Sequence, residues 1–298
     1  MAWENTAIPS KAFWEENTPR RPQRAVPLSL EPGELLYTAG MEFDPGLFSN
    51  LKDKDYSKSG LMVLEGRIVI EKAIAGGIEL LGLVRSDDSG EDWLQAHGGK
   101  FPVKRLSHGE LCAIAGFNFH HGAIALGKRP GIEAIGVESL EAREGAWLCL
   151  WNVTDPSNLG ALIRTAAGLG ARGALLGPGC ADPYYRKTLR ASMGNVFSLP
   201  LRSCDAALLA SLGSRGFDLA AATLSPSALP LGSFSPRPPF ALVLGNEGFG
   251  LPADIVGLCR NEVYIPMAPG IDSLNVVVAG GICMYELFGN RAGGFRRP

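Results

Sequence analysis

Three stretches of the sequence place polar side chains directly after apolar runs, where ligand sites of α/β proteins are commonly found. In the first, an apolar run leads into Asp155-Pro156 and then into a predicted helix. Ser157 or Asn158 is expected to cap this helix by accepting a free backbone N–H. Asn158 precedes Arg164 by six residues, nearly two helical turns, so we expect both side chains to face one side of a sheet edge. The simpler interpretation is an ordinary turn with a surface arginine.

The second stretch is an apolar run at residues 242–244 that ends in Gly245-Asn246-Glu247-Gly248. Glycines at the end of a strand allow a ligand to approach the backbone closely. The spacing differs from the G-x-G-x-x-G fingerprint, and no acidic residue follows at the dinucleotide distance, so a nicotinamide cofactor is not expected. A plain glycine turn is the alternative.

The third stretch begins with a predicted strand at residues 263–265 and continues through a loop into a long apolar helix at residues 274–288. Asp272 or Ser273 is expected to cap this helix. Asn275 stands out as a carboxamide in a first turn otherwise made of apolar residues. Because a buried carboxamide is costly unless it is hydrogen-bonded, Asn275 is either a functional residue or a structural cap.

Together the three stretches resemble the motifs of the SpoU (TrmH-type) family of RNA ribose 2′-O-methyltransferases, in the SPOUT superfamily. They occur in the family's order between residues 147 and 289, and residues 185–194 resemble the family's segment between its first two motifs. The resemblance implies that a methyl group passes from S-adenosylmethionine to a ribose 2′-hydroxyl in structured tRNA or rRNA. It also implies a deep trefoil knot and a homodimer whose active site takes residues from both subunits.

Carried over motif by motif, the resemblance assigns roles to residues of this sequence. The implied catalytic residues are Arg164, Asn158, Glu247, Ser273 and Asn275. The implied cofactor-binding residues are Thr223, Leu224, Gly245, Ile265, Met267 and Leu274. An arginine is often described as the general base in this family, but a guanidinium should stay protonated. We therefore expect Arg164 to clamp the phosphate beside the target ribose, and Glu247 to orient Arg164 or to accept the proton.

Further cationic and aromatic side chains are candidates for contact with RNA. Arg186, Lys187 and Arg190, beside Tyr184 and Tyr185, are expected to contact phosphates and bases, with a solvated helix face as the alternative. The aromatic and histidine residues at 117–121 either stack on RNA or pack within the neighbouring domain.

The elements that must position these residues fall into two regions. From residue 147, short apolar runs alternate with helical patterns, which predicts an α/β fold with a mostly parallel sheet and helices on both faces. Strands at 61–64, 79–84 and 123–127 and helices at 67–75 and 109–115 predict a small α/β domain, similar to the substrate-binding domain that often precedes this catalytic domain. The expected organisation is a flexible arm at 1–58, a small RNA-binding domain at 59–130, a linker at 131–145 and the catalytic domain at 146–298.

Composition limits the alternatives. A chain of 298 residues with 46 % hydrophobic and 19 % charged residues is expected to be globular. The net charge of −2 gives no overall positive field, so RNA binding must depend on local clusters of cations. The six cysteines form no C-x-x-C pair, so neither a disulfide framework nor a metal site is expected. The basic, proline-rich first thirty residues lack the apolar stretch of a secretory signal, and no run is long enough to span a membrane, so we expect a cytoplasmic protein.

Two other functions fit the same fold. One is a catalytically inactive RNA-binding protein, and the other is a methyltransferase that acts on an RNA base. The intact candidate catalytic residues argue against the first. The Asn-Glu-Gly and Ser-Leu-Asn motifs favour ribose over a base.

Overall fold

The computed structural model describes residues 44–48, 53–86, 101–115, 122–133, 145–271 and 273–290. These residues form two sheets, and both sheets belong to one compact unit of the chain. None of the described helices is long and apolar enough to cross a membrane.

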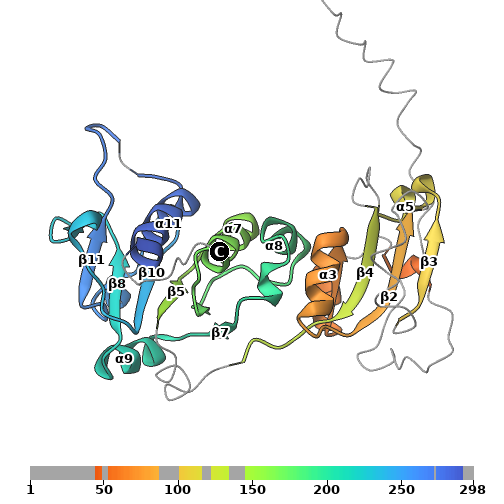
Figure 1. Ribbon diagram of the computed structural model, residues 1–298, viewed down its shortest axis with the longest axis horizontal. Coiled ribbons are helices and arrows are strands. Elements are labelled where there is room, and N and C mark those ends of the chain that lie inside the picture. The colour runs from red at the N-terminus through yellow and green to blue at the C-terminus, as the bar shows by residue number, and fades with distance from the viewer. Residues whose placement is uncertain are drawn as a thin grey trace, which may run out of the picture. The chain divides into compact units, whose positions relative to one another are not determined.

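The smaller sheet has the strand order β1-β4-β2-β3, in which β4 pairs antiparallel with β1 and β2, and β3 pairs parallel with β2 (Figure 1). Its elements are η1 (Pro45–Phe48), α2 (Asp53–Lys58), β1 (Leu61–Glu65), α3 (Arg67–Ala75), β2 (Leu80–Ser86), β3 (Val103–Leu106), α5 (His108–Ala115) and β4 (Ala123–Lys128). All five elements predicted in this region are confirmed to within two residues. The strand β3 was not predicted, because Lys104 and Arg105 interrupt its apolar pattern.

Residues expected to belong to a flexible arm take part in this small domain. Phe48 and Tyr56 are buried, and the Tyr56 hydroxyl donates a hydrogen bond of 2.8 Å to the carbonyl oxygen of Leu47. Burial raises the pKa of Tyr56 to about 12. The small domain therefore begins before residue 59. Burial of these two aromatic side chains in its core holds the segment in place, although charged residues surround them in the sequence.

The larger sheet has seven strands in the order β7-β6-β5-β10-β8-β11-β9, and every neighbouring pair is parallel. Its strands are β5 (Ala146–Leu150), β6 (Gly173–Leu176), β7 (Leu201–Ser203), β8 (Asp218–Ala222), β9 (Leu229–Pro230), β10 (Phe240–Leu244) and β11 (Asn261–Tyr264). The accompanying helices are α7 (Pro156–Gly168), α8 (Arg186–Ala191), η3 (Asn195–Phe197), α9 (Ala206–Ser214), η4 (Leu231–Ser233), α10 (Ala253–Val256), α11 (Val276–Met284) and η5 (Tyr285–Asn290).

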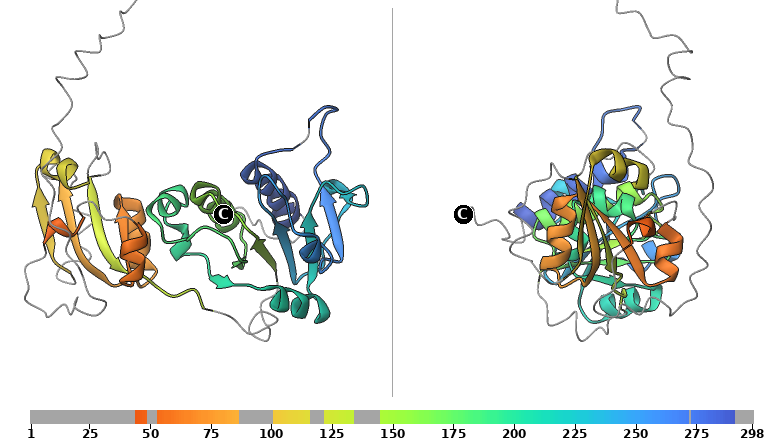
Figure 2. Two further views of the ribbon diagram at one scale, coloured as in Figure 1. Left: turned by 180° about the vertical axis from the view of Figure 1, so that it is seen from behind. Right: turned by 90° about the vertical axis from the view of Figure 1, so that its right-hand side faces the viewer.

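Alternate residues of β5 belong to two different cores, one on each face of this sheet. Leu148 packs with residues of α7 and α11, whereas Trp147 and Cys149 pack with residues of α9 and α10. Figures 1 and 2 show α9 on the opposite side of the strands from α7 and α11. This arrangement confirms the predicted fold class, since a parallel sheet must be covered on both faces.

Helix α7 lies unusually close to α8. A Cβ atom on Gly160 would come within 2.5 Å of the carbonyl oxygen of Thr188. The glycine in the Asn158–Arg164 motif therefore has a packing role, because any side chain there would push α8 away.

Ion pairs join the small domain to α8. The Glu65 carboxylate, only 1 % exposed, accepts hydrogen bonds from Arg186 and Arg190, and Arg186 also pairs with Asp53 at 2.9 Å. Nearby, Arg129 forms a 2.7 Å ion pair with Asp182. These contacts link segments far apart in the sequence.

We expect Glu65→Ala to lower the free energy of unfolding by about 2–3 kcal/mol, because it removes the buried carboxylate that Arg190 and Arg186 share and leaves Arg186 with Asp53. The value lies below that for a fully buried pair because Arg190 is 41 % exposed. The control is Glu79→Ala, which breaks an exposed pair with Lys128 and should cost less than about 1 kcal/mol. Equal losses for the two variants in urea unfolding would contradict this role for Glu65.

Candidate active site

Three loops that carry candidate cofactor residues start at the same edge of the large sheet. Strand β8 lies between β10 and β11, and all three strands are parallel. Their carboxyl ends therefore lie side by side, and the chain leaves them at Thr223, Gly245 and Ile265. The Thr223 amide donates a 3.0 Å hydrogen bond to the carbonyl oxygen of Val263, which holds the β8 loop against β11.

The loop after β10 is closed on itself. Asn246 and Gly250 exchange two backbone hydrogen bonds, of 3.1 and 2.9 Å, and the Asn246 Oδ1 atom accepts from the amide of Gly248 at 2.8 Å. The Asn246 Nδ2 atom donates to the carbonyl oxygen of Asn152 at 2.9 Å, which ties the loop to the segment after β5. Asn246 thus organises this loop, a role that its sequence pattern did not indicate.

Gly245 has no space for a side chain. A Cβ atom would lie 2.4 Å from the carbonyl carbon of Gly250 and 2.6 Å from the amide nitrogen of Leu251. Both are backbone atoms of the same loop, so they cannot move aside without opening it. The glycine is required by the closure of the loop.

The structure brings the first two motifs together through Asn158 and Glu247. The Asn158 Nδ2 atom donates a hydrogen bond to Glu247 Oε1. Asn158 is available for this contact because it does not cap α7; the cap is Asp155, whose Oδ1 accepts from the Ser157 amide at 2.6 Å. The predicted cap at Ser157 or Asn158 is wrong because Pro156, which lacks an N–H, occupies the first helical position, so the cap is the residue before it, Asp155.

Arg164 is exposed on α7 and has no ion-pair partner among the residues that the structure describes. In the described residues no hydrogen bond or ion pair joins Arg164 to Asn158 or Glu247, so the expectation that Arg164 and Asn158 face one side of the sheet edge stays a prediction. The positive charge of Arg164 disfavours the protonated, positively charged form of Lys72 on α3. Burial and this charge together lower the pKa of Lys72, which donates a 2.5 Å hydrogen bond to Asn195 Oδ1.

The third motif places Asn275 at the start of α11. Its Oδ1 atom accepts a 2.8 Å hydrogen bond from the Val277 amide, which makes Asn275 the helix cap. The prediction of Asp272 or Ser273 as the cap is therefore wrong; Asp272 itself lies outside the described residues. Ser273 and Asn275 are exposed, while Leu274 is half-buried.

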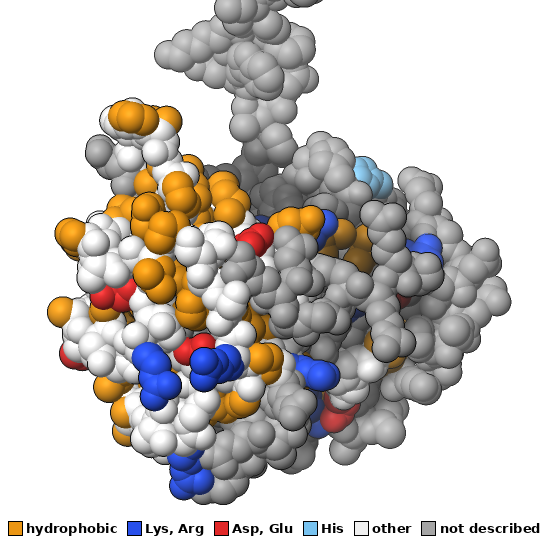
Figure 3. All heavy atoms as spheres, turned by 60° about the vertical axis from the view of Figure 1, so that its left-hand side comes forward, with side chains coloured by type: hydrophobic (Ala, Val, Ile, Leu, Met, Phe, Trp, Pro, Cys, Tyr) orange, Lys and Arg blue, Asp and Glu red, His pale blue; other side chains and the backbone are white. Residues whose placement is uncertain are grey.

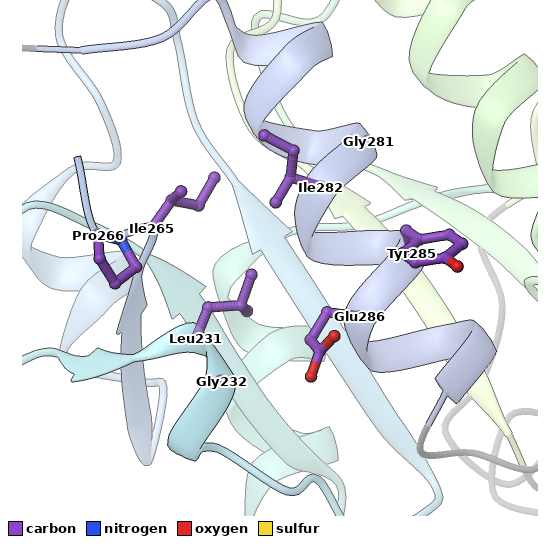
Figure 4. A pocket seen from close by; sticks show the side chains of 8 residues that line it. All are labelled: Leu231, Gly232, Ile265, Pro266, Gly281, Ile282, Tyr285 and Glu286. Carbon is purple, nitrogen blue, oxygen red and sulfur yellow. The ribbon is translucent and has the colours of Figure 1, made fainter. Parts of the chain in front are cut away.

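A pocket of about 450 Å³ opens between the end of β11 and the last helix (Figure 4). Figure 4 shows the side chains of Ile265, Leu231 and Ile282 facing one another across it. Ile265 is the one predicted cofactor residue in its lining; Thr223, Leu224, Gly245, Met267 and Leu274 do not line it.

The cations of α8 are held by carboxylates in the structure. Lys187 pairs with Asp155 at 3.0 Å, and Arg186 and Arg190 bind Glu65. Tyr184 is buried beneath the guanidinium of Arg129, 5.3 Å from its ring centre. Contact of these cations with RNA stays a prediction, and residues 117–121 lie outside the described residues.

The chain is similar in sequence to known RNA methyltransferases. Residues 145–285 match the SpoU rRNA Methylase family. An uncharacterized tRNA/rRNA methyltransferase of Mycobacterium bovis is 33 % identical over 76 % of this chain and 80 % of its own length. The 23S rRNA (guanosine-2′-O-)-methyltransferase RlmB of Acinetobacter baylyi is 32 % identical over 64 % and 79 %.

Solved structures share the fold. The crystal structure of an RNA 2′-O ribose methyltransferase aligns with a TM-score of 0.64 and 27 % identity, over 81 % of this chain and 92 % of the other. An AdoMet-bound rRNA methyltransferase from Sinorhizobium meliloti aligns with a TM-score of 0.69 and 24 % identity, over 81 % and 91 %. The chain belongs to the SpoU rRNA methylase family.

Proposed function

We propose that this protein transfers a methyl group from S-adenosylmethionine to a ribose 2′-hydroxyl in structured RNA, and that ribosomal RNA is its substrate. The observation that carries the proposal is the hydrogen bond between Asn158 and Glu247, which joins two family motifs at one edge of the parallel sheet. The relative RlmB, named for 2′-O-methylation of 23S rRNA, supports the choice of RNA.

The loops beyond β8, β10 and β11 fit S-adenosylmethionine. Gly245 allows the loop after β10 to close, and Ile265 offers an apolar surface suited to an adenine. Thr223 and Leu224 begin the loop after β8, the strand that lies between β10 and β11. When bound there, the cofactor supplies a methyl group on a sulfonium, which is open to attack by an oxygen nucleophile.

The protein's own residues must then hold the ribose, remove the hydroxyl proton and stabilise the developing charge. Glu247 is exposed, and Asn158 holds one of its carboxylate oxygens. We assign the second oxygen to the 2′-hydroxyl proton. Arg164, exposed and without an ion-pair partner in the described ranges, binds the adjacent phosphate as a fork of two N–H donors. Ser273 and Asn275 complete the site.

A homodimer accounts for the exposed apolar face of the last helix. Val278, Ile282 and Tyr285 are 50 %, 41 % and 58 % exposed, and their spacing places them on one side of the helix. Figure 3, in which the left-hand side of Figure 1 is turned toward the viewer, shows hydrophobic side chains gathered on that side. A second copy covering this face would lie close to the segment of Ser273 and Asn275, so the two subunits would share the site. We further propose that cofactor binding needs no metal and that the protein acts in the cytoplasm.

Ile282→Arg is expected to convert the dimer to a monomer, because a charge cannot be buried unpaired in an apolar interface. Sedimentation velocity at micromolar concentration measures the change. Ile68→Arg is the matched control, since Ile68 is 48 % exposed on α3 of the small domain and should leave the dimer intact. A dimer that persists in Ile282→Arg would move the interface away from this helix.

The proposed reaction is tested by incubating the protein with ribosomal RNA and S-adenosylmethionine labelled in the methyl group, with a metal chelator present. A 2′-O-methyl group blocks alkaline cleavage of the next phosphodiester, so the label should appear in alkali-resistant dinucleotides. Label recovered in single nucleotides would indicate a base methyltransferase. Absence of label from RNA, with tight cofactor binding retained, would favour an inactive RNA-binding protein.

A further inference from the structure

Phe249 is the most exposed large hydrophobic residue among those that the structure describes, with 91 % of its surface accessible. It lies two residues after Glu247, at the tip of the closed loop between Asn246 and Gly250. A single exposed apolar side chain needs no explanation by itself. Phe249 needs an explanation because it lies beside the candidate catalytic carboxylate of Glu247.

The ring is presented by a fixed backbone. The Phe249 amide donates a 3.2 Å hydrogen bond to Asn246 Oδ1, and the Gly248 amide donates to the same oxygen. Asn246 is in turn bound to the carbonyl oxygen of Asn152. The loop therefore holds the Phe249 backbone at a defined place next to Glu247.

The surroundings of the ring favour a nucleobase over a protein surface. Gly248 and Gly250 flank Phe249 without side chains, and the neighbouring Glu247 is exposed and charged. Protein interfaces bury contiguous apolar patches. Base stacking needs only one aromatic ring with an accessible face, and unpaired RNA bases are commonly bound in this way.

We propose that Phe249 stacks on an RNA base next to the target ribose and so positions that ribose at Glu247. The inference rests on the proposed function and adds a residue that binds RNA within the second motif. Stacking contributes to RNA affinity and leaves the cofactor site untouched. Phe249 is thus a positioning residue for the nucleotide, separate from the groups that move the proton.

The test compares three variants of the full chain, Phe249→Ala, Phe249→Leu and Phe249→Tyr, in single-turnover methylation of ribosomal RNA from a strain that lacks the gene. Phe249→Ala should weaken apparent RNA affinity by about 10- to 100-fold, the range for losing one stacked base. The maximal rate should change much less, and S-adenosylmethionine affinity should stay within about twofold. Phe249→Tyr should restore RNA affinity because it keeps a ring, whereas Phe249→Leu should not.

Two results would overturn the inference while leaving the proposed function intact. One is an unchanged RNA affinity in Phe249→Ala. The other is a shift of Phe249→Ala from dimer to monomer in sedimentation, with Phe249→Leu restoring both dimer and activity, which would assign the ring to contact with a second copy. If the unaltered protein methylates no RNA, the proposed function itself fails, and this outcome is distinct from both.

Discussion

Replacing Arg164 by lysine is expected to lower the single-turnover rate of RNA methylation by at least about a hundredfold, the scale for losing one preorganised stabilising group. Lysine keeps the charge but loses the planar fork that binds two phosphate oxygens at once. Arg164→Ala should be slower still. Affinity for S-adenosylmethionine should survive both changes, because the loops at Thr223, Gly245 and Ile265 start from other elements.

The control is Arg260→Lys, a change at another exposed arginine of the same domain, which should leave the rate within about twofold. The pH profile then separates the role of Arg164 from that of Glu247. If the Glu247 carboxylate accepts the hydroxyl proton, the rate of the unaltered enzyme falls at low pH, and Glu247→Gln removes that dependence. A native rate in Arg164→Ala would show that the catalytic assignment is wrong and that the motifs describe a binding fold.

Gly245→Ala is expected to weaken S-adenosylmethionine binding by at least about tenfold, with a matching loss of methylation. The added Cβ would collide with the backbone of Gly250 and Leu251, so the loop must open and the contact between Glu247 and Asn158 is lost. Titration calorimetry measures the cofactor affinity directly.

Gly248→Ala is the matched control within the same loop. A Cβ atom there meets only Asn246 Oδ1, at the ordinary contact distance of 3.5 Å, and Gly248 is not in a left-handed backbone conformation. Its cofactor affinity should therefore stay within a few-fold of the unaltered protein. Equal losses in the two variants would show that the loop is merely fragile and that Gly245 has no special place in the site.

Elements with a clear local signal could be predicted from the sequence. The helix α3 (Arg67–Ala75) has apolar residues at helical spacing and ends at Gly76, so both its type and its ends were predicted correctly. Five of the seven parallel strands of the large sheet were predicted from short apolar runs, whereas β7 and β9, of three and two residues, were not. The strand β3 lacks such a signal, since exposed and half-exposed residues alternate along it.

Contacts between distant segments could not be predicted in this way. Glu65 and Arg190 are 125 residues apart, and nothing in either local pattern indicates that they pair. From the sequence the arginines of α8 were predicted as RNA ligands, and their ion pairs with the small domain were not foreseen; contact with RNA stays a prediction. The strand order that places β8 between β10 and β11 is equally invisible to periodicity, and the knot implied by the resemblance stays a prediction.

Asn275 shows a different difficulty, because the same side chain suits two roles. An asparagine before an apolar helix is a good cap, and the structure confirms that it caps α11. A cap uses only the Oδ1 atom, so Nδ2 remains available to a substrate. Sequence alone named both roles, and the geometry establishes the first while the second stays a proposal.

The most direct test of ribose methylation is a map of 2′-O-methyl groups in ribosomal and transfer RNA from cells with and without the gene. We expect at least one ribose methylation to disappear without the gene, to return with the unaltered protein and not to return with Arg164→Ala. An unchanged map, or the loss of a base methylation in place of a ribose methylation, would contradict this expectation.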